Sequence, residues 1–249
     1  MKEKTLIGKS HIIPEFMYQD LYDENHKFYF FSPKEKFEGT GYTKRPSSGE
    51  YEGGLLCAEC DGGIIGSYES YARLALEGGL SKNEKIEVLN YKNQHGVKGS
   101  LVKNINYKKF KLFLLSILWR ASISSRPLFS AIALGPHEEI LRKMIFEGNP
   151  ETSTDYPIVF MTYVNDKDMP QDIIAQPKKL RNGNGNLLYA FIIGGFFYNF
   201  FVNSKQHNIP EFVHKETISP NDQMHIYHLT GKESWEILAG YFELNKSGS

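Results

Sequence analysis

The stretch LLYAFIIGGFFYNFFV, residues 187–202, is apolar at almost every position. A helix that spans a membrane needs about 20 such residues, so this stretch is too short for that role. Gly194 and Gly195 stand at its centre, between two runs rich in Phe, Tyr and Ile, which favour β-strands. A Gly-Gly pair suits the tight turn of a hairpin. The sequence therefore predicts a buried β-hairpin, in a protein that does not enter a membrane.

The segments around this hairpin predict an α+β fold with a mostly antiparallel sheet. Further runs rich in strand-forming residues cover 156–164, 171–177 and 223–230. Apolar residues at helical spacing predict helices at 64–77, at 106–124, from Pro136 to residue 146, and at 232–245. The polar stretch 81–100 is either a short hairpin or a linker. We therefore expect a small N-terminal module, residues 1–82, followed by a larger α+β body, residues 83–249.

The overall charge argues against a self-sufficient nucleic-acid-binding surface. The 249 residues include 29 basic and 29 acidic side chains, which gives a formal net charge of zero. Proteins that bind nucleic acid unaided usually have a basic excess, so any such contact must come from a local patch or from a partner protein. The chain has only two cysteines, and its first residues lack the apolar region of a signal peptide. These features predict a cytoplasmic protein without a disulfide framework.

The two cysteines belong to the phrase LLCAECD, residues 55–61, which begins 45 positions after the phrase SHIIPEF, residues 10–16. Two thiolates at the spacing Cys57-x-x-Cys60 match half of a structural zinc site. A complete site needs four ligands, and the chain has no second cysteine pair. His26 is the nearest further candidate ligand. The alternative is a pair of thiols at a strand-to-helix turn, with no metal.

Three phrases in this order resemble HNH endonucleases, and more closely a set of bacterial HNH-related proteins. They are SHIIPEF, LLCAECD followed by SYESYA, and FLLSILWRASIS at 113–124. The resemblance covers about the first half of the chain. It implies a ββα-metal, treble-clef-like module and metal-dependent hydrolysis of phosphodiesters. It also implies a setting in prophage, restriction or anti-phage modules.

The resemblance assigns His11 as the general base that deprotonates the attacking water. An imidazole has an unperturbed pKa near ~6.5, so its neutral form is available at cellular pH. Ser10 departs from the family, because a strong metal ligand is expected at that position. Asp61 and Glu69 share a face if the helix begins early, and their oxygens suit Mg²⁺ or Mn²⁺. Gly62 and Gly63 leave that register open.

Each of these residues also has a purely structural interpretation. His11 can be a buried ring whose nitrogens satisfy backbone groups. Asp61 can cap the helix that follows. Glu69 can form a surface pair with Arg73 one helical turn later.

A cluster of basic residues is the candidate contact for nucleic acid phosphates. It consists of Lys108, Lys109, Lys111 and Arg120, with Lys103 and Arg126 nearby. The alternative is that these side chains only solvate the ends of a helix. Two functions follow from the whole sequence. One is an HNH-like nuclease that acts on nucleic acid, and the other is a catalytically degenerate scaffold that recognises a protein partner or a small ligand.

Overall fold

The predicted hairpin forms as β8 (Leu187–Ile193) and β9 (Phe196–Phe201), which pair in antiparallel register. Gly194 and Gly195 connect them with φ angles of 58° and 78°. Both residues of a two-residue type I′ hairpin turn have positive φ, a region that glycine enters without steric cost. The prediction of a hairpin at this position is confirmed.

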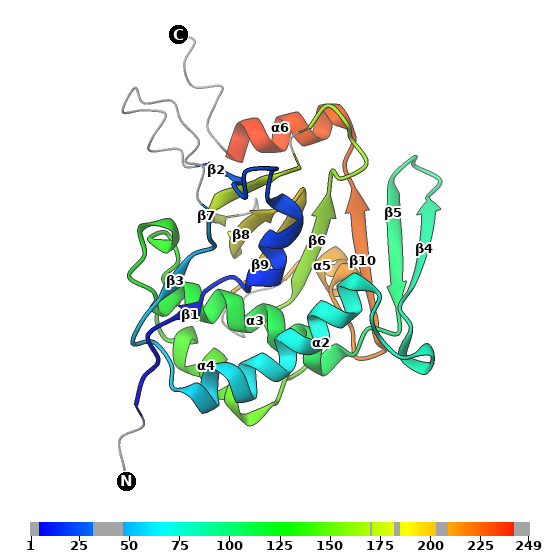
Figure 1. Ribbon diagram of the computed structural model, residues 1–249. Coiled ribbons are helices and arrows are strands. Elements are labelled where there is room, and N and C mark those ends of the chain that lie inside the picture. The colour runs from blue at the N-terminus through cyan, green and yellow to red at the C-terminus, as the bar shows by residue number, and fades with distance from the viewer. Residues whose placement is uncertain (1–4, 32–46, 170, 182–184, 203–208, 242–249) are drawn as a thin grey trace.

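The computed structural model describes residues 5–31, 47–169, 171–181, 185–202 and 209–241. Its fold is mixed α+β, as predicted, with eight strands in the order β2-β7-β8-β9-β6-β10-β5-β4 (Figure 1). The pairs β2–β7 and β6–β10 are parallel, and the other neighbouring strands are antiparallel. The remaining bounds are β2 (Tyr29–Phe31), β4 (Glu87–Lys92), β5 (Lys98–Lys103), β6 (Ile158–Thr162), β7 (Ile173–Arg181) and β10 (Gln223–His228). The polar stretch 81–100 thus contributes to a hairpin, β4–β5, rather than to a linker.

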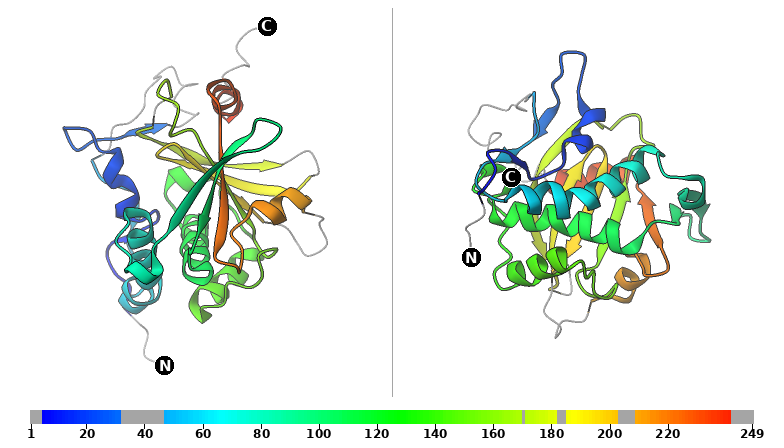
Figure 2. Two further views of the ribbon diagram at one scale, coloured as in Figure 1. Left: turned by 90° about the vertical axis from the view of Figure 1, so that its right-hand side faces the viewer. Right: turned by 60° about the horizontal axis from the view of Figure 1, so that its bottom comes forward.

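Helices cover both faces of this sheet (Figure 2). Side chains along a strand alternate between the two faces. On β9, Phe200 joins the larger core with the helix α3 (Tyr107–Ile123), while Phe197 joins a second core with the helix α6 (Gly231–Tyr241). The sheet therefore has apolar residues on both sides, which explains the nearly continuous apolarity of residues 187–202.

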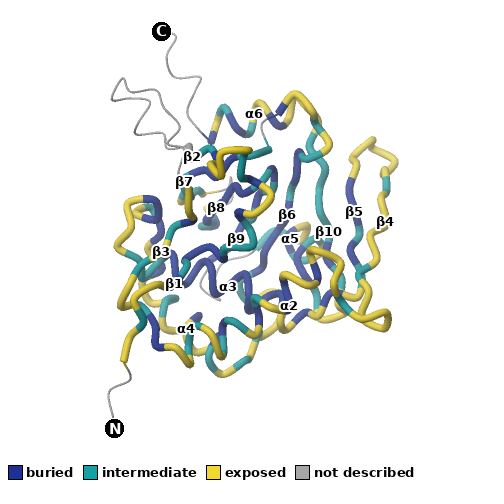
Figure 3. Tube along the Cα trace, in the orientation of Figure 1, coloured by how far each residue is buried: buried dark blue, intermediate teal, exposed yellow. Residues whose placement is uncertain are grey.

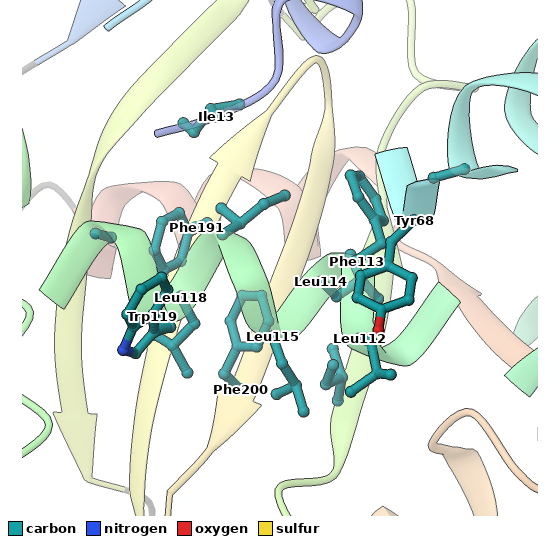
Figure 4. Packing of buried hydrophobic residues seen from close by; sticks show 14 of the residues in the cluster. Ile13, Tyr68, Leu112, Phe113, Leu114, Leu115, Leu118, Trp119, Phe191 and Phe200 are labelled. Carbon is teal, nitrogen blue, oxygen red and sulfur yellow. The ribbon is translucent and has the colours of Figure 1, made fainter. Parts of the chain in front are cut away.

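The helix α3 lies at the centre of the larger core. Its N-cap is Asn106, whose side chain accepts a hydrogen bond from the backbone N–H of Lys109. Leu112, Leu114 and Leu118 are fully buried. Figure 3 shows the burial along this helix, and Figure 4 shows its side chains packed against Phe191 and Phe200 of the sheet. The predicted helix at 106–124, buried on most sides, is confirmed.

Two further predicted helices form, as α2 (Gly66–Glu77) and α4 (His137–Glu147). The sequence did not predict the other helical segments, which are η1 (Glu15–Leu21), η2 (Glu59–Ile65), η3 (Lys82–Glu84), η4 (Pro127–Phe129) and α5 (Glu211–Glu216). The π-helical turn η2 leads directly into α2, which ends at Gly78 with a φ of 75°. Residues 242–245 of the predicted last helix lie outside the described residues. Within the described part of the chain, no helix is both long and apolar enough to cross a bilayer.

The N-terminal residues pack together with the rest of the chain. The strand β2 pairs with β7 in the large sheet. Ile12 and Ile65, from the predicted module, belong to the same buried cluster as Phe160 of the predicted body. Residues on both sides of the expected boundary at residue 82 therefore contribute to the large sheet and to one buried cluster.

Candidate active site

Two short strands and a helix position the residues that the sequence singled out. The strand β1 (Ser10–His11) pairs antiparallel with β3 (Tyr51–Glu52), so that His11 lies opposite Tyr51. The chain then passes through η2 into α2. The two strands pair although η1 and β2 lie between them in the sequence.

A polar cavity of about 410 Å³ lies between these elements and η1. Six of its lining residues carry ionisable side chains, namely His11, Glu15, Asp61, Glu69, Arg73 and Arg120. They come from β1, η1, η2, α2 and α3. The cavity thus unites His11 with Asp61 and Glu69, the residues predicted to work together.

The imidazole of His11 faces the carboxylate of Glu15. Its Nε2 lies 3.1 Å from Glu15 Oε2, an ion-pair distance, but the angle is not that of a hydrogen bond, and both atoms are buried without another partner among the described residues. Burial lowers the pKa of His11 below 6.5. The charges of Lys9 and Arg120 lower it further, whereas Glu15 and Asp61 oppose this effect. His11 is therefore neutral at pH 7, and its side chain, 25% exposed, is not sealed in the core.

Arg120, on α3, connects three of the elements that line the polar cavity. It is 1% exposed, and its Nη1 donates to the carbonyl oxygen of His11 at 2.6 Å. Its Nη2 donates to Glu69 Oε1 at 2.6 Å, and its Nε donates to the carbonyl oxygen of Ser116 at 3.2 Å. The guanidinium therefore fixes β1 and α2 to α3.

Asp61 is tied to the strand that carries His11. The hydroxyl of Ser10 donates to Asp61 Oδ1 at 2.5 Å. Asp61 lies inside η2, and α2 has no side-chain cap, so the interpretation of Asp61 as its N-cap is wrong. This hydrogen bond places the carboxylate of Asp61 beside Ser10, the position where the family resemblance expects a metal ligand.

Glu69 is partly buried, with its side chain 25% exposed. Burial raises its pKa, the nearby charge of Asp61 adds to this effect, and the charge of Arg120 opposes it. Its ionic partner is Arg120, not Arg73 as in the structural interpretation of the sequence. Arg73 is exposed at the cavity, and no described residue forms an ion pair or hydrogen bond with it. A guanidinium without an ionic partner in the described ranges thus lines the same cavity as the carboxylates.

The cavity fits a hydrated hard cation better than a closed metal site. Within the described ranges, no three His, Cys, Asp or Glu side chains converge on one point. Mg²⁺ is commonly held by one or two carboxylates, with water and substrate phosphates as its other ligands. Asp61 and Glu69 meet that requirement, and the carboxylate of Glu15, whose Oε2 lies beside His11 Nε2, also lines the cavity. The donor set therefore fits Mg²⁺ or Mn²⁺.

The predicted zinc ligands are not assembled. Cys57 is buried and Cys60 is half-buried at the start of η2. The ring of His26 instead stacks on Tyr22, with ring centroids 3.9 Å apart. Among the residues described, these cysteines gain no third ligand.

The predicted basic patch divides between surface and interior. Lys108 and Lys109 are exposed on the first turn of α3. Lys111 is buried, and its Nζ donates to the carbonyl oxygens of Thr152 and Asp155 at 2.6 and 2.7 Å. Burial lowers the pKa of Lys111 to about 7. Because Arg120 is also buried, a single exposed patch of these four residues does not exist.

Sequence reasoning missed two residues of the cavity. One of them is Glu15, which lies within the phrase SHIIPEF, four positions after His11. This spacing is the signal that could have identified it. Arg73 was considered only as a partner of Glu69. No known family model matches this chain, and neither a curated protein nor a solved structure matches it. The functional interpretation therefore depends on the geometry of the cavity and on the resemblance of the three phrases.

Proposed function

We propose that the chain is an HNH-like, metal-dependent phosphodiesterase whose general base is His11. One observation carries this proposal: His11, Asp61 and Glu69 line the same polar cavity, although 58 positions separate the first from the last. The pairing of β1 with β3, followed along the chain by α2, supports it, because a ββα-metal module also combines two antiparallel strands with a helix.

The proposed reaction begins with proton transfer to His11. The lowered pKa keeps the ring neutral at pH 7, so that one ring nitrogen accepts a proton from a water molecule as it attacks phosphorus. Glu15 lies against the other side of the ring and stabilises the imidazolium that forms. Glu15 is therefore a positioning residue in this scheme, and His11 is the catalytic residue.

Asp61 and Glu69 would hold the divalent cation. When bound, the cation supplies positive charge that stabilises the phosphate and the leaving oxygen. Arg73, exposed and without an ionic partner among the described residues, would contact a phosphate oxygen. Arg120 takes no direct part, because its donors are used by His11, Glu69 and Ser116.

The test is cleavage of single- and double-stranded DNA and RNA by the purified chain with Mg²⁺ or Mn²⁺. His11→Ala is expected to reduce the rate by about 10²- to 10⁴-fold, which is the usual contribution of a general base. His95→Ala is the matched control, because His95 is exposed in the turn between β4 and β5. A His11→Ala protein that cleaves as fast as the wild type would remove the proposal.

Cation binding is a separate test. Titration calorimetry with Mn²⁺ is expected to show binding that Asp61→Asn and Glu69→Gln each weaken. Glu69→Gln keeps an oxygen for Arg120 and so spares the fold. Unchanged Mn²⁺ binding in both variants would contradict this assignment of ligands.

A scaffold or binding protein is the second candidate function. It is favoured by Arg120, whose buried contacts make the backbone of His11 and the side chain of Glu69 part of the fold itself. A chain that neither cleaves nucleic acid nor binds Mn²⁺ would support this alternative.

A further inference from the structure

A second cavity, of about 520 Å³, lies between η1, α2 and the sheet. Its walls are mostly apolar and include Phe16, Leu76, Phe110, Phe160, Tyr198 and Ile226. The polar residues Gln19, Asp20 and Glu77 also line it. Its size is within the range of small-molecule sites, about 300–1,000 Å³.

This aromatic cavity adjoins the polar cavity that contains His11. Phe16 and Gln19 of η1 line both of them. Along α2, Glu69 and Arg73 line the polar cavity, and Leu76 lines the aromatic one. Residues three or four apart share a face of a helix, and three residues rise by about 4.5 Å. One face of α2 therefore leads from Glu69 through Arg73 to Leu76, and Arg73 is about one helical turn from the aromatic cavity.

The aromatic cavity contains polar groups that the protein does not satisfy. No described residue forms a hydrogen bond with the hydroxyl of Tyr198, and burial raises the pKa of this tyrosine, so the hydroxyl stays neutral and can donate. Asp20 and Glu77 are exposed and likewise have no ionic or hydrogen-bonding partner in the described part of the chain. The cavity thus offers one hydroxyl and two carboxylates around an apolar interior.

We propose that the aromatic cavity binds a nucleobase of the substrate, next to the phosphodiester that His11 attacks. This inference rests on the proposed function. A base is flat and has apolar faces that pack on aromatic side chains. Its amino group would donate to Asp20 or Glu77, as amino-bearing bases do to carboxylates. The same carboxylates repel phosphates, so the backbone stays in the cavity lined by Arg73.

The substrate class follows from this arrangement. A base inside a duplex is stacked and paired, and it cannot enter a cavity without leaving the helix. The preferred substrate is therefore a single strand or an unpaired nucleotide with an amino-bearing base. The neutral net charge of the chain agrees with recognition that does not depend on a broad basic surface.

Binding of free nucleosides tests the cavity without requiring cleavage. Adenosine, cytidine, guanosine and uridine are added separately to the full chain, and saturation-transfer NMR reports binding. We expect the three amino-bearing nucleosides to bind better than uridine, both to the wild type and to His11→Ala. Tyr198→Phe is expected to weaken binding by about three- to tenfold, the usual effect of one lost hydrogen bond.

Two pairs, each of a cavity variant and a control variant, distinguish effects on the aromatic cavity from general effects on the fold. Tyr163→Phe is the control for Tyr198→Phe, because the Tyr163 hydroxyl is buried without a partner among the described residues and belongs to a different core cluster. Leu76→Glu places a charge on the cavity wall and is expected to weaken binding, whereas Leu74→Glu, on the same helix outside both cavities, is not.

The outcomes distinguish the two proposals. Loss of nucleoside binding in Tyr198→Phe and Leu76→Glu but not in their controls supports the inference. Absence of nucleoside binding, or binding that these two variants leave unchanged, overturns it even if the chain cleaves nucleic acid. If the chain binds nucleosides but cleaves no nucleic acid, the proposed base-binding site is supported and the proposed nuclease function is refuted.

Discussion

Arg120 Nη2 lies 2.6 Å from Glu69 Oε1, and this hydrogen bond joins residues that are 51 positions apart. The arginine side chain is 2% exposed and that of Glu69 is 25% exposed. The same guanidinium holds the carbonyl oxygen of His11. One buried cation thus determines where the candidate base and a candidate metal ligand lie relative to each other.

Replacing this cation should destabilise the protein strongly. Arg120→Met leaves the carboxylate of Glu69 and the carbonyl oxygen of His11 without their donor. We expect the free energy of unfolding in urea to fall by about 3 kcal/mol, at the lower end for a broken buried pair because Glu69 is partly exposed. Arg142→Met is the control, because Arg142 and Glu139 form an exposed pair, which solvent screens, so its loss should cost much less than the loss of Arg120. Equal losses in both variants would contradict the role given to Arg120.

The protonation of His11 should depend on Glu15. The negative charge of Glu15 raises the pKa of His11 and partly offsets the effect of burial. Glu15→Gln removes this charge, so the pKa of His11 should fall further below 6.5. An NMR titration of the ring protons, assigned with His11→Gln, measures both values. The acid limb of any cleavage activity should move to lower pH in the same variant, because the neutral base then persists to lower pH. A pKa that rises in Glu15→Gln would show that the two side chains do not interact as described.

Lys111 should matter for stability and not for nucleic acid binding. Its ammonium group donates to two backbone carbonyl oxygens and to the hydroxyl of Tyr107. Lys111→Met leaves these acceptors buried without a donor, at an expected cost of about 1–3 kcal/mol in urea unfolding. Lys108→Met changes an exposed residue of the same helix and should have little effect on stability. If Lys111→Met has the stability of the wild type but binds nucleic acid more weakly, Lys111 would belong to a binding surface, contrary to this prediction.

The turn between β8 and β9 should depend on Gly195. Its φ is 78°, and a Cβ there would lie 2.9 Å from Val164 Cγ1. Gly195→Ala should therefore cost more than about 1 kcal/mol of unfolding free energy. Gly54→Ala separates strain from crowding, since Gly54 has a φ of 79° but no atom near the position of its Cβ. The melting temperature of Gly195→Ala should therefore be lower than that of Gly54→Ala. The reverse order would show that contact with Val164 does not destabilise the Gly195→Ala variant.

Local pattern was sufficient for the central hairpin and the longest helices of this fold, but not for the short strands β1, β2 and β3. The Gly-Gly pair and the flanking aromatic residues predicted β8 and β9, because turn geometry and strand preference are properties of neighbouring residues. The dense apolar residues of 106–124 predicted a buried helix for the same reason. The separation into a module and a body could not be judged this way. It depends on which surfaces pack together, and β2 joined the far edge of the large sheet.

The positions of single residues in the candidate site likewise could not be predicted from neighbouring residues alone. The eight-residue spacing of Asp61 and Glu69 suggested that they share a side of one helix, but Gly62 and Gly63 left this undecided. The continuous path of η2 and α2, together with the contacts of Ser10 and Arg120, brings both carboxylates to one cavity.

The sequence by itself determined the β8–β9 hairpin, the other strands predicted after residue 155 and the four predicted helices. It also determined the absence of a basic excess and the identity of the histidine, carboxylate and cysteine residues worth testing. Only the tertiary structure decided that Lys111 and Arg120 are internal, that Glu69 pairs with Arg120 rather than Arg73, and that an aromatic cavity adjoins the polar one. The physical reason is that burial and pairing depend on contacts between segments distant in the chain. The order of residues sets which groups are available, and packing sets which of them meet.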